Sequence, residues 1–179
     1  MRRQTRMLTG LAVFVGLLMV LPLGWAADMS KDLAAKYILL TAKAARTVYV
    51  KGVIGKAKQG GVKPNEGWVK ADHAIMLPAQ FVKEMGRKIK DFQLGLIGSD
   101  PLYKSNSPQT PAEKNALVEL SRGKKKIVTF QDGKQFKGMS ADFAIVQGCA
   151  DCHNKHKNAT KKDFKKGDFM GAIVVRFKG

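Results

Sequence analysis

The sequence Ile-Val-Thr-Phe-Gln-Asp-Gly-Lys-Gln-Phe, residues 127–136, decides the fold. Its first four residues are β-branched or aromatic, as is typical of strands, and Asp132-Gly133 is a tight-turn signal. We therefore expect Gln135 to begin the partner strand of a β-hairpin. Residues 141–147 predict another strand and residues 172–177 a last one. The C-terminal part of the chain is thus expected to form an antiparallel sheet.

The residues before this hairpin indicate three helices. Residues 30–55 carry apolar side chains at three- and four-residue steps, and Ser30 can cap the start. The predicted buried face is Leu33, Tyr37, Leu40, Ala44 and Val48, with Lys31, Lys36 and Lys43 pointing outward. After a loop at residues 59–65, a second helix begins near Pro78, since proline is tolerated in a first turn. Its predicted apolar face is Phe81, Met85, Ile89 and Phe92.

The third helix has the clearest start signal in the chain, after a turn-rich connection at residues 95–108. Thr110 is the expected N-cap, Pro111 occupies the first helical position, and Glu113 completes a capping box. Its predicted buried side chains are Ala116, Leu117 and Leu120. Helices followed by an antiparallel sheet indicate an α+β fold. A chain of 179 residues, 45% of them hydrophobic, suits a single domain.

The first 26 residues are typical of a secretory signal peptide. Arg2, Arg3 and Arg6 form a basic start, residues 8–23 are almost continuously apolar, and Ala26 offers a small residue for cleavage. We predict a cut after Ala26, a mature domain at residues 27–179 and a periplasmic location in a bacterium. An uncleaved membrane anchor is the alternative, although the apolar run is short for a span of about 20 residues.

The chain is strongly basic, with 32 Lys and Arg against 14 Asp and Glu and a formal charge of +18. Removal of the signal peptide would take away three arginines and leave a charge of about +15. Such a charge usually suggests nucleic acid, but export argues against that partner. We expect an acidic redox partner protein or an anionic membrane surface instead. The sequence does not indicate the oligomeric state.

Cys149, Cys152 and His153 form the pattern Cys-x-x-Cys-His, and the chain has no other cysteine. Two thiols at this spacing can form thioethers with the two vinyl groups of a haem, and the adjacent histidine can then ligate the iron. The pattern therefore predicts one covalently attached haem c, with His153 as the proximal ligand. We expect both cysteines to lie on a loop between late strands.

Two other kinds of site share these residue types. A thioredoxin-like redox pair expects its two cysteines at a helix start within a βαβ unit, whereas here the helices precede the strands. A zinc site could draw on Cys149, Cys152, His153 and His156, but four ligands within eight residues would strain a tetrahedron. Covalent haem is the interpretation that the sequence favours.

The sixth iron ligand is left open by the sequence. His73 is the candidate distal histidine, because it lies far from the motif and can approach from the other side. His156 is too close to His153 and is expected on the solvated surface. The candidate methionines are Met76, Met85, Met139 and Met170, of which Met85 fits core packing better. A distal position without a protein ligand is a further alternative.

The mature chain resembles a family of monohaem c-type cytochrome domains with a PAS-like fold, catalogued as a domain of unknown function. The haem motif is the specific part of the resemblance, and the order of the other matching segments adds to it. These segments are Ala45-Arg46-Thr47-Val48-Tyr49, Leu77-Pro78-Ala79-Gln80-Phe81, residues 106–113 and Gly167-Asp168-Phe169-Met170-Gly171-Ala172-Ile173. The resemblance implies a PAS-like sheet that holds the haem near the cysteines. Family members occur as exported proteins and as sensor domains of histidine kinases and chemoreceptors.

We therefore expect an exported monohaem cytochrome that acts in electron transfer. The alternative is a haem-based redox or gas sensor for NO, CO or O₂ that works with a separate partner. No residue pattern indicates an enzyme, and no catalytic residues are predicted.

Overall fold

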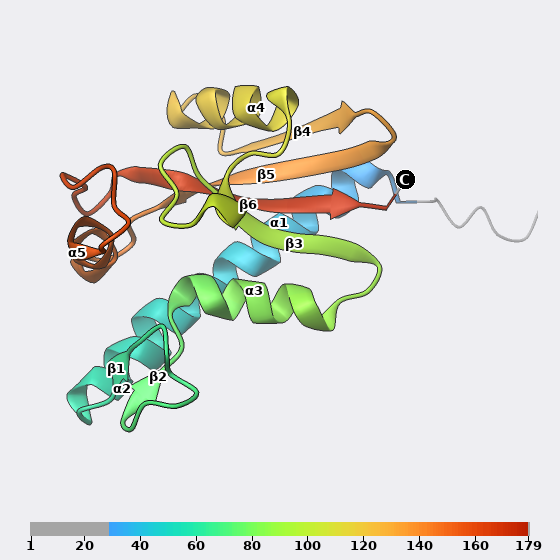
Figure 1. Cartoon of the computed structure of the whole chain (residues 1–179). Helices are drawn as coiled ribbons and strands as arrows, with labels where there is room; N and C mark the ends of the chain where they lie inside the picture. Colours follow the sequence, from blue (N-terminus) through green and yellow to red (C-terminus); the bar gives the residue numbers. More distant parts are fainter. Residues whose placement is uncertain (1–28, 179) are drawn as a thin grey trace, which may run out of the picture.

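The computed structural model describes residues 29–178, which form helices on both faces of one antiparallel sheet (Figure 1). The sheet contains β3 (Phe92–Ile97), β4 (Ile127–Asp132), β5 (Gln135–Phe143) and β6 (Phe169–Phe177). Its order is β3-β6-β5-β4, and every neighbouring pair is antiparallel. The predicted α+β class is confirmed. The predicted signal peptide lies outside the described residues.

Two hydrophobic clusters lie on opposite faces of the sheet. The helices α1 (Lys31–Val48) and α3 (Pro78–Lys88) cover one face, and α4 (Pro111–Ser121) covers the other. Successive residues of β6 point to alternate faces, so Ile173 packs with α1 and α3 whereas Val174 packs with α4. The strand β6 is therefore the centre of both clusters.

The buried face of α1 differs from the predicted one. Ala35, Leu39, Ala42 and Arg46 are buried, whereas the predicted residues Leu33, Tyr37, Leu40, Ala44 and Val48 are exposed. The reason is the close approach of the helix to Gly138 in β5, where an added Cβ would lie 3.0 Å from the Cβ of Ala35. Small side chains permit this approach, and the larger apolar residues are therefore left outside.

A strand that the sequence analysis missed occupies residues 92–97. Phe92 was predicted on a helix, but α3 ends at Lys88 and Ile89 is already extended, with φ −99° and ψ 130°. Phe92 then pairs with Phe177 at the start of β3. The prediction that all helices precede the strands was therefore wrong, because β3 lies between α3 and α4.

Several local predictions are confirmed. Ser30 accepts a hydrogen bond from the Leu33 amide, and Thr110 accepts one from the Glu113 amide. The turn at Asp132-Gly133 joins β4 to β5, with Gly133 at φ 58°. The Glu113 side chain does not close a capping box, since its Oε2 accepts from the Gln109 amide instead.

Short elements complete the described chain. A π-helical stretch, η1 (Tyr49–Ile54), and α2 (Gly55–Gln59) continue α1, and the 3-10 helix η2 (Lys104–Asn106) precedes α4. The two-residue strands β1 (Lys63–Pro64) and β2 (Ala74–Ile75) pair in parallel. Within residues 29–178, no helix combines the length and apolar character that a bilayer span requires.

Candidate functional site

Cys149, Cys152 and His153 lie on a short helix, α5 (Gln147–Lys155), between β5 and β6. Their place between the last two strands is as predicted, but the predicted loop is helical. The predicted strand at residues 141–147 is confirmed only for residues 141–143, because β5 ends at Phe143 and the helix begins four residues later. Residues spaced by three and four positions share one face of a helix. The three side chains are therefore on the same side of α5.

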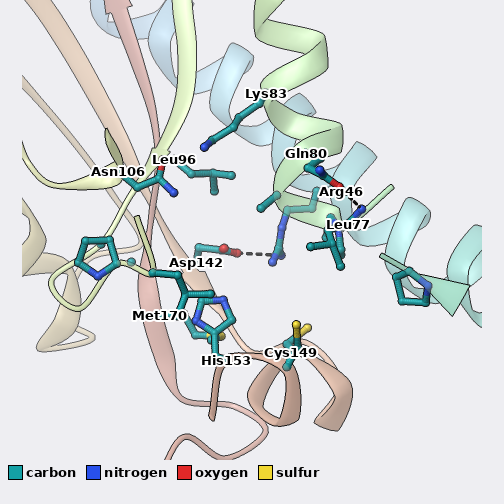
Figure 2. Close-up of a pocket in the computed structure, with 18 of the residues that line it drawn as sticks. Arg46, Leu77, Gln80, Lys83, Leu96, Asn106, Asp142, Cys149, His153 and Met170 are labelled. Atoms are coloured by element: carbon teal, nitrogen blue, oxygen red, sulfur yellow. Dashed lines mark hydrogen bonds and ion pairs between the residues drawn. The ribbon is translucent and has the colours of Figure 1, made fainter. Parts of the chain in front are cut away.

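This helix forms one wall of a cavity of about 1020 Å³. Cys149, Cys152 and His153 all line the cavity, and Figure 2 shows the His153 ring directed into it. The other walls come from segments that are distant in sequence: α1 and η1, the start of α3, the end of β3 with its following loop, and the start of β6. Their lining side chains include Arg46, Val50, Ile54, Leu77, Lys83, Leu96, Asn106 and Met170.

The imidazole of His153 is largely withdrawn from solvent. Its Nδ1 is buried and has no hydrogen-bond partner among the described residues. Burial, followed by the charges of His156 and Arg46, lowers the pKa of His153. Burial therefore favours the neutral ring, which is the form that ligates metals.

Asn154 and Phe164 fix α5 to the segment that returns to β6. The Asn154 Nδ2 donates to the Phe164 carbonyl at 2.9 Å, and the Asn154 Oδ1 accepts from the Phe164 amide at 3.0 Å. Phe164 packs with Ala144 and Ala150 in a small buried cluster, against which Cys149 and Met170 lie. The helix that carries the motif is thus held by the packing of Ala150 in the buried cluster and by the hydrogen bonds of Asn154 near its C-terminal end.

The two cysteines are free thiols. Desolvation, together with the Glu66 carboxylate and Cys149, raises the pKa of the Cys152 thiol. A redox-active cysteine usually has a lowered pKa, and α5 joins two antiparallel strands rather than forming part of a βαβ unit. Neither feature supports a thioredoxin-like pair.

The structure also gives no support to a zinc site. In the part of the chain that the structure describes, no three His, Cys, Asp or Glu side chains gather as a metal site would require. His156 lies at the C-terminal cap of α5, with its ring 5.6 Å from that of Tyr103 and its Nε2 3.4 Å from Glu66. It is therefore partly buried against these residues rather than solvated as predicted.

A buried ion pair occupies the cavity wall formed by α1 and β5. The Arg46 Nη1 lies 2.9 Å from the Asp142 Oδ1, and both side chains are more than nine-tenths buried. Burial raises the pKa of Asp142, and the nearby Arg46 and Lys43 charges oppose that rise. Sequence reasoning missed both residues as part of the site. The signal that could have found Arg46 is a charged residue in helical register with Ala35, Leu39 and Ala42.

The candidate sixth ligands are scattered through the fold. His73 is exposed just before β2, with φ 51°, and is not among the residues that line the cavity. Met85 and Met139 pack in the two hydrophobic clusters of the sheet, and Met76 is also absent from the cavity lining. Met170, at the start of β6, does line the cavity, and it packs against the small buried cluster of Ala144, Ala150 and Phe164, as Cys149 does.

Comparison with known protein families gives a match. The model of the Tll0287-like family matches residues 27–177, which is nearly the whole described chain. The chain belongs to the Tll0287-like family. A similar solved structure, titled as the crystal structure of the cyanobacterial haem protein Tll0287, agrees with this. The two sequences are 17% identical, and the structures superpose with a TM-score of 0.56. The match covers 82% of this Tll0287-like chain and 95% of the solved chain.

At that identity the likeness shows the fold. The haem of that relative is a property of the relative, and the family match by itself names no cofactor. The comparison with curated proteins returned no match.

Proposed function

We propose that this chain is a c-type cytochrome domain with one haem, attached through Cys149 and Cys152 and ligated by His153. The observation that carries the proposal is the common placement of these three side chains on one wall of the 1020 Å³ cavity. Ligand pockets commonly measure about 300–1,000 Å³, so this cavity is large enough for a large planar cofactor. The haem protein in the same fold adds support.

The chemistry of the donor set fits a haem. Both thiols are free to form thioethers, and the His153 ring has a buried Nδ1 for which residues 29–178 provide no hydrogen-bond partner. When bound, a haem supplies an iron that cycles between the ferric and ferrous states. Phe164 and Asn154 orient the helix that carries these groups.

We propose electron transfer outside the cytoplasm as the role of the domain. Cys152 is exposed, so one edge of the attachment site is open to a partner. The strongly basic chain would steer an acidic redox protein, and such steering weakens as salt screens the charges. A cleaved signal peptide and a periplasmic location belong to this proposal, and no enzymatic activity does.

A haem-based redox or gas sensor is the second candidate. The observation that favours it is the position of the candidate distal ligands, since His73, Met76, Met85 and Met139 do not line the cavity and, of the candidates, only Met170 does. An iron without a strong sixth ligand would bind NO, CO or O₂. The reduced protein distinguishes the two roles: a low-spin spectrum that CO does not change favours electron transfer, and rapid adduct formation favours sensing.

The attachment is tested with the full chain produced in a host that assembles c-type cytochromes. We expect a mass gain of about 616 Da and a Soret band. Cys149→Ala and Cys152→Ala should each remove one thioether, and the double variant should lose covalent haem. His153→Ala should change the spectrum, whereas the control His156→Ala, three residues along, should leave it unchanged. A wild-type protein without the mass gain and the band would refute the proposal.

A further inference from the structure

The cavity has two chemically different walls. The α5 wall carries Cys149, Cys152 and His153, and Met170 of β6 packs against the same buried cluster as Cys149. The α1 wall carries apolar residues of η1 and the Arg46–Asp142 pair. Figure 2 shows the Arg46 guanidinium and the His153 ring extending into the cavity from opposite walls.

The α1 wall offers a hydrogen-bond donor where a distal ligand would be expected. Across residues 29–178, the cavity lining contains no histidine besides His153 and no methionine besides Met170. A guanidinium is permanently protonated and so does not ligate iron, but its five N–H groups bind anions well. The wall opposite His153 is therefore suited to hold a ligand rather than to supply one.

The side chain of Arg46 is held in place, but not all of its N–H groups have a hydrogen-bond partner among the described residues. Asp142 holds its Nη1, while its Nε is buried without a hydrogen-bond partner among the described residues. Asp142 itself is placed by an irregularity in the β5–β6 register between Asp142 and Phe143. The Lys43 Nζ donates a hydrogen bond to the Ala141 carbonyl at 2.9 Å and so ties α1 to β5 one residue before Asp142. The guanidinium is thus preorganised at the cavity wall.

We propose that Arg46 is the distal residue of the site, and that the sixth position of the iron is left to a small anionic ligand from solution. Asp142 is the positioning residue that orients the guanidinium. The inference rests on the proposed haem attachment and, of the two candidate roles, deepens the second, in which the iron binds a small ligand, because it names the class of ligand and the side chain that selects it. A hydrogen bond to a charged group stabilises the bound anion more than a neutral one does.

The test uses the ferric holoprotein, after mass spectrometry has shown that each variant carries its haem. Fluoride and azide are titrated while the absorption spectrum is followed. The wild type should be high-spin and should bind fluoride. Arg46→Gln should bind it about 10- to 100-fold more weakly, as expected for the loss of one charge-assisted hydrogen bond. Asp142→Asn should show a smaller loss, because the guanidinium remains but is less well held.

Arg87→Gln is the matched control. Arg87 also lines the cavity but is exposed, with 70% of its side chain accessible, so its removal should change fluoride affinity less than about twofold. If Arg46→Gln does not fold because Asp142 is left unpaired, the Arg46→Gln/Asp142→Asn variant removes both charges together. It should show the same loss of affinity.

Two outcomes would overturn this inference and leave the proposed haem attachment in place. One is a ferric wild-type holoprotein that is low-spin and does not bind fluoride, because a protein side chain would then occupy the sixth position. The other is an unchanged fluoride affinity in the Arg46 variants. A protein that carries no haem would instead overturn the proposed function, and this inference with it.

Discussion

The imidazole of His153 meets the ring of Phe164 edge to face, with centroids 5.9 Å apart and planes at 83°. Phe164 is itself buried and is tied to α5 through the side chain of Asn154. The orientation of the proposed iron ligand is therefore set by a residue eleven positions later in the chain. Phe164 is a positioning residue in this site.

Phe164→Leu should loosen this arrangement. An edge-to-face aromatic pair contributes about 0.5–1.5 kcal/mol, so we expect a modest fall in the free energy of unfolding. The holoprotein should in addition show a shifted Soret band. The matched control is Phe169→Leu, which breaks the pair with Phe143, also 5.9 Å apart. Urea unfolding and absorption spectra check both variants, and equal spectral shifts would contradict the special role of Phe164.

Leu39 and Leu40 test the observed face of α1. Leu39 is fully buried and Leu40 is 52% exposed. Leu39→Ala should lower the free energy of unfolding by about 2–5 kcal/mol. Leu40→Ala should change it by less than about 0.5 kcal/mol. Chemical denaturation measures both, and the reverse order would support the face predicted from the sequence.

The sequence predicted the class of fold well and the packing of individual helices less well. The hairpin around Asp132-Gly133 and the starts at Ser30, Pro78 and Thr110 depend on local chemistry, so they can be predicted from a few residues. The buried face of α1 depends on how closely the helix approaches Gly138. That distance is a property of the assembled sheet, and apolar periodicity does not contain it.

The missed strand and the missed ion pair have similar causes. Ile89 and Phe92 continue the three-residue spacing of α3, which hides the start of β3. Cys149, Cys152 and His153 lie within five residues of one another, so their grouping could be predicted. Arg46 and Asp142 are far apart in the chain and meet only when α1 packs on β5. No local pattern shows that they share a wall.

Glu113 should make the free energy of unfolding depend on pH in the acid range. Burial raises the pKa of this carboxyl, but hydrogen bonds from Arg176, the Gln109 amide and Lys137 outweigh burial and lower it to about 2 from 4.5. A lowered pKa in the folded state contributes stability that is complete above pH 4.5 and is lost as the pH falls towards 2. The contribution is about 3 kcal/mol.

Glu113→Gln checks this contribution by urea unfolding at pH 7, 4 and 3. The variant should be less stable at pH 7, by about 3–5 kcal/mol, because Lys137 and Arg176 lose their buried partner. Its stability should then fall less steeply with acid than that of the wild type. Parallel pH profiles for the two proteins would show that Glu113 does not carry the effect.

Gly171 should not tolerate a side chain. Its φ is 141°, and an added Cβ would collide with the backbone of Ile97 and Gly98. We expect Gly171→Ala to lower the free energy of unfolding by more than about 2 kcal/mol. Gly95→Ala is the control on the neighbouring strand, where a Cβ meets nothing within 4 Å. It should be neutral or slightly stabilising, and thermal unfolding compares the two.

The contiguity of the motif on α5 bears on the order in which such a protein is made. Cys149, Cys152 and His153 lie within five residues and need no partner strand to be close together, so a newly made chain presents all three while it is still unfolded. The facing wall forms only when α1 docks on the sheet, a long-range contact of the slow kind. On the proposed attachment, covalent binding of the haem can therefore come first, and the rest of the polypeptide can then fold around the bound cofactor.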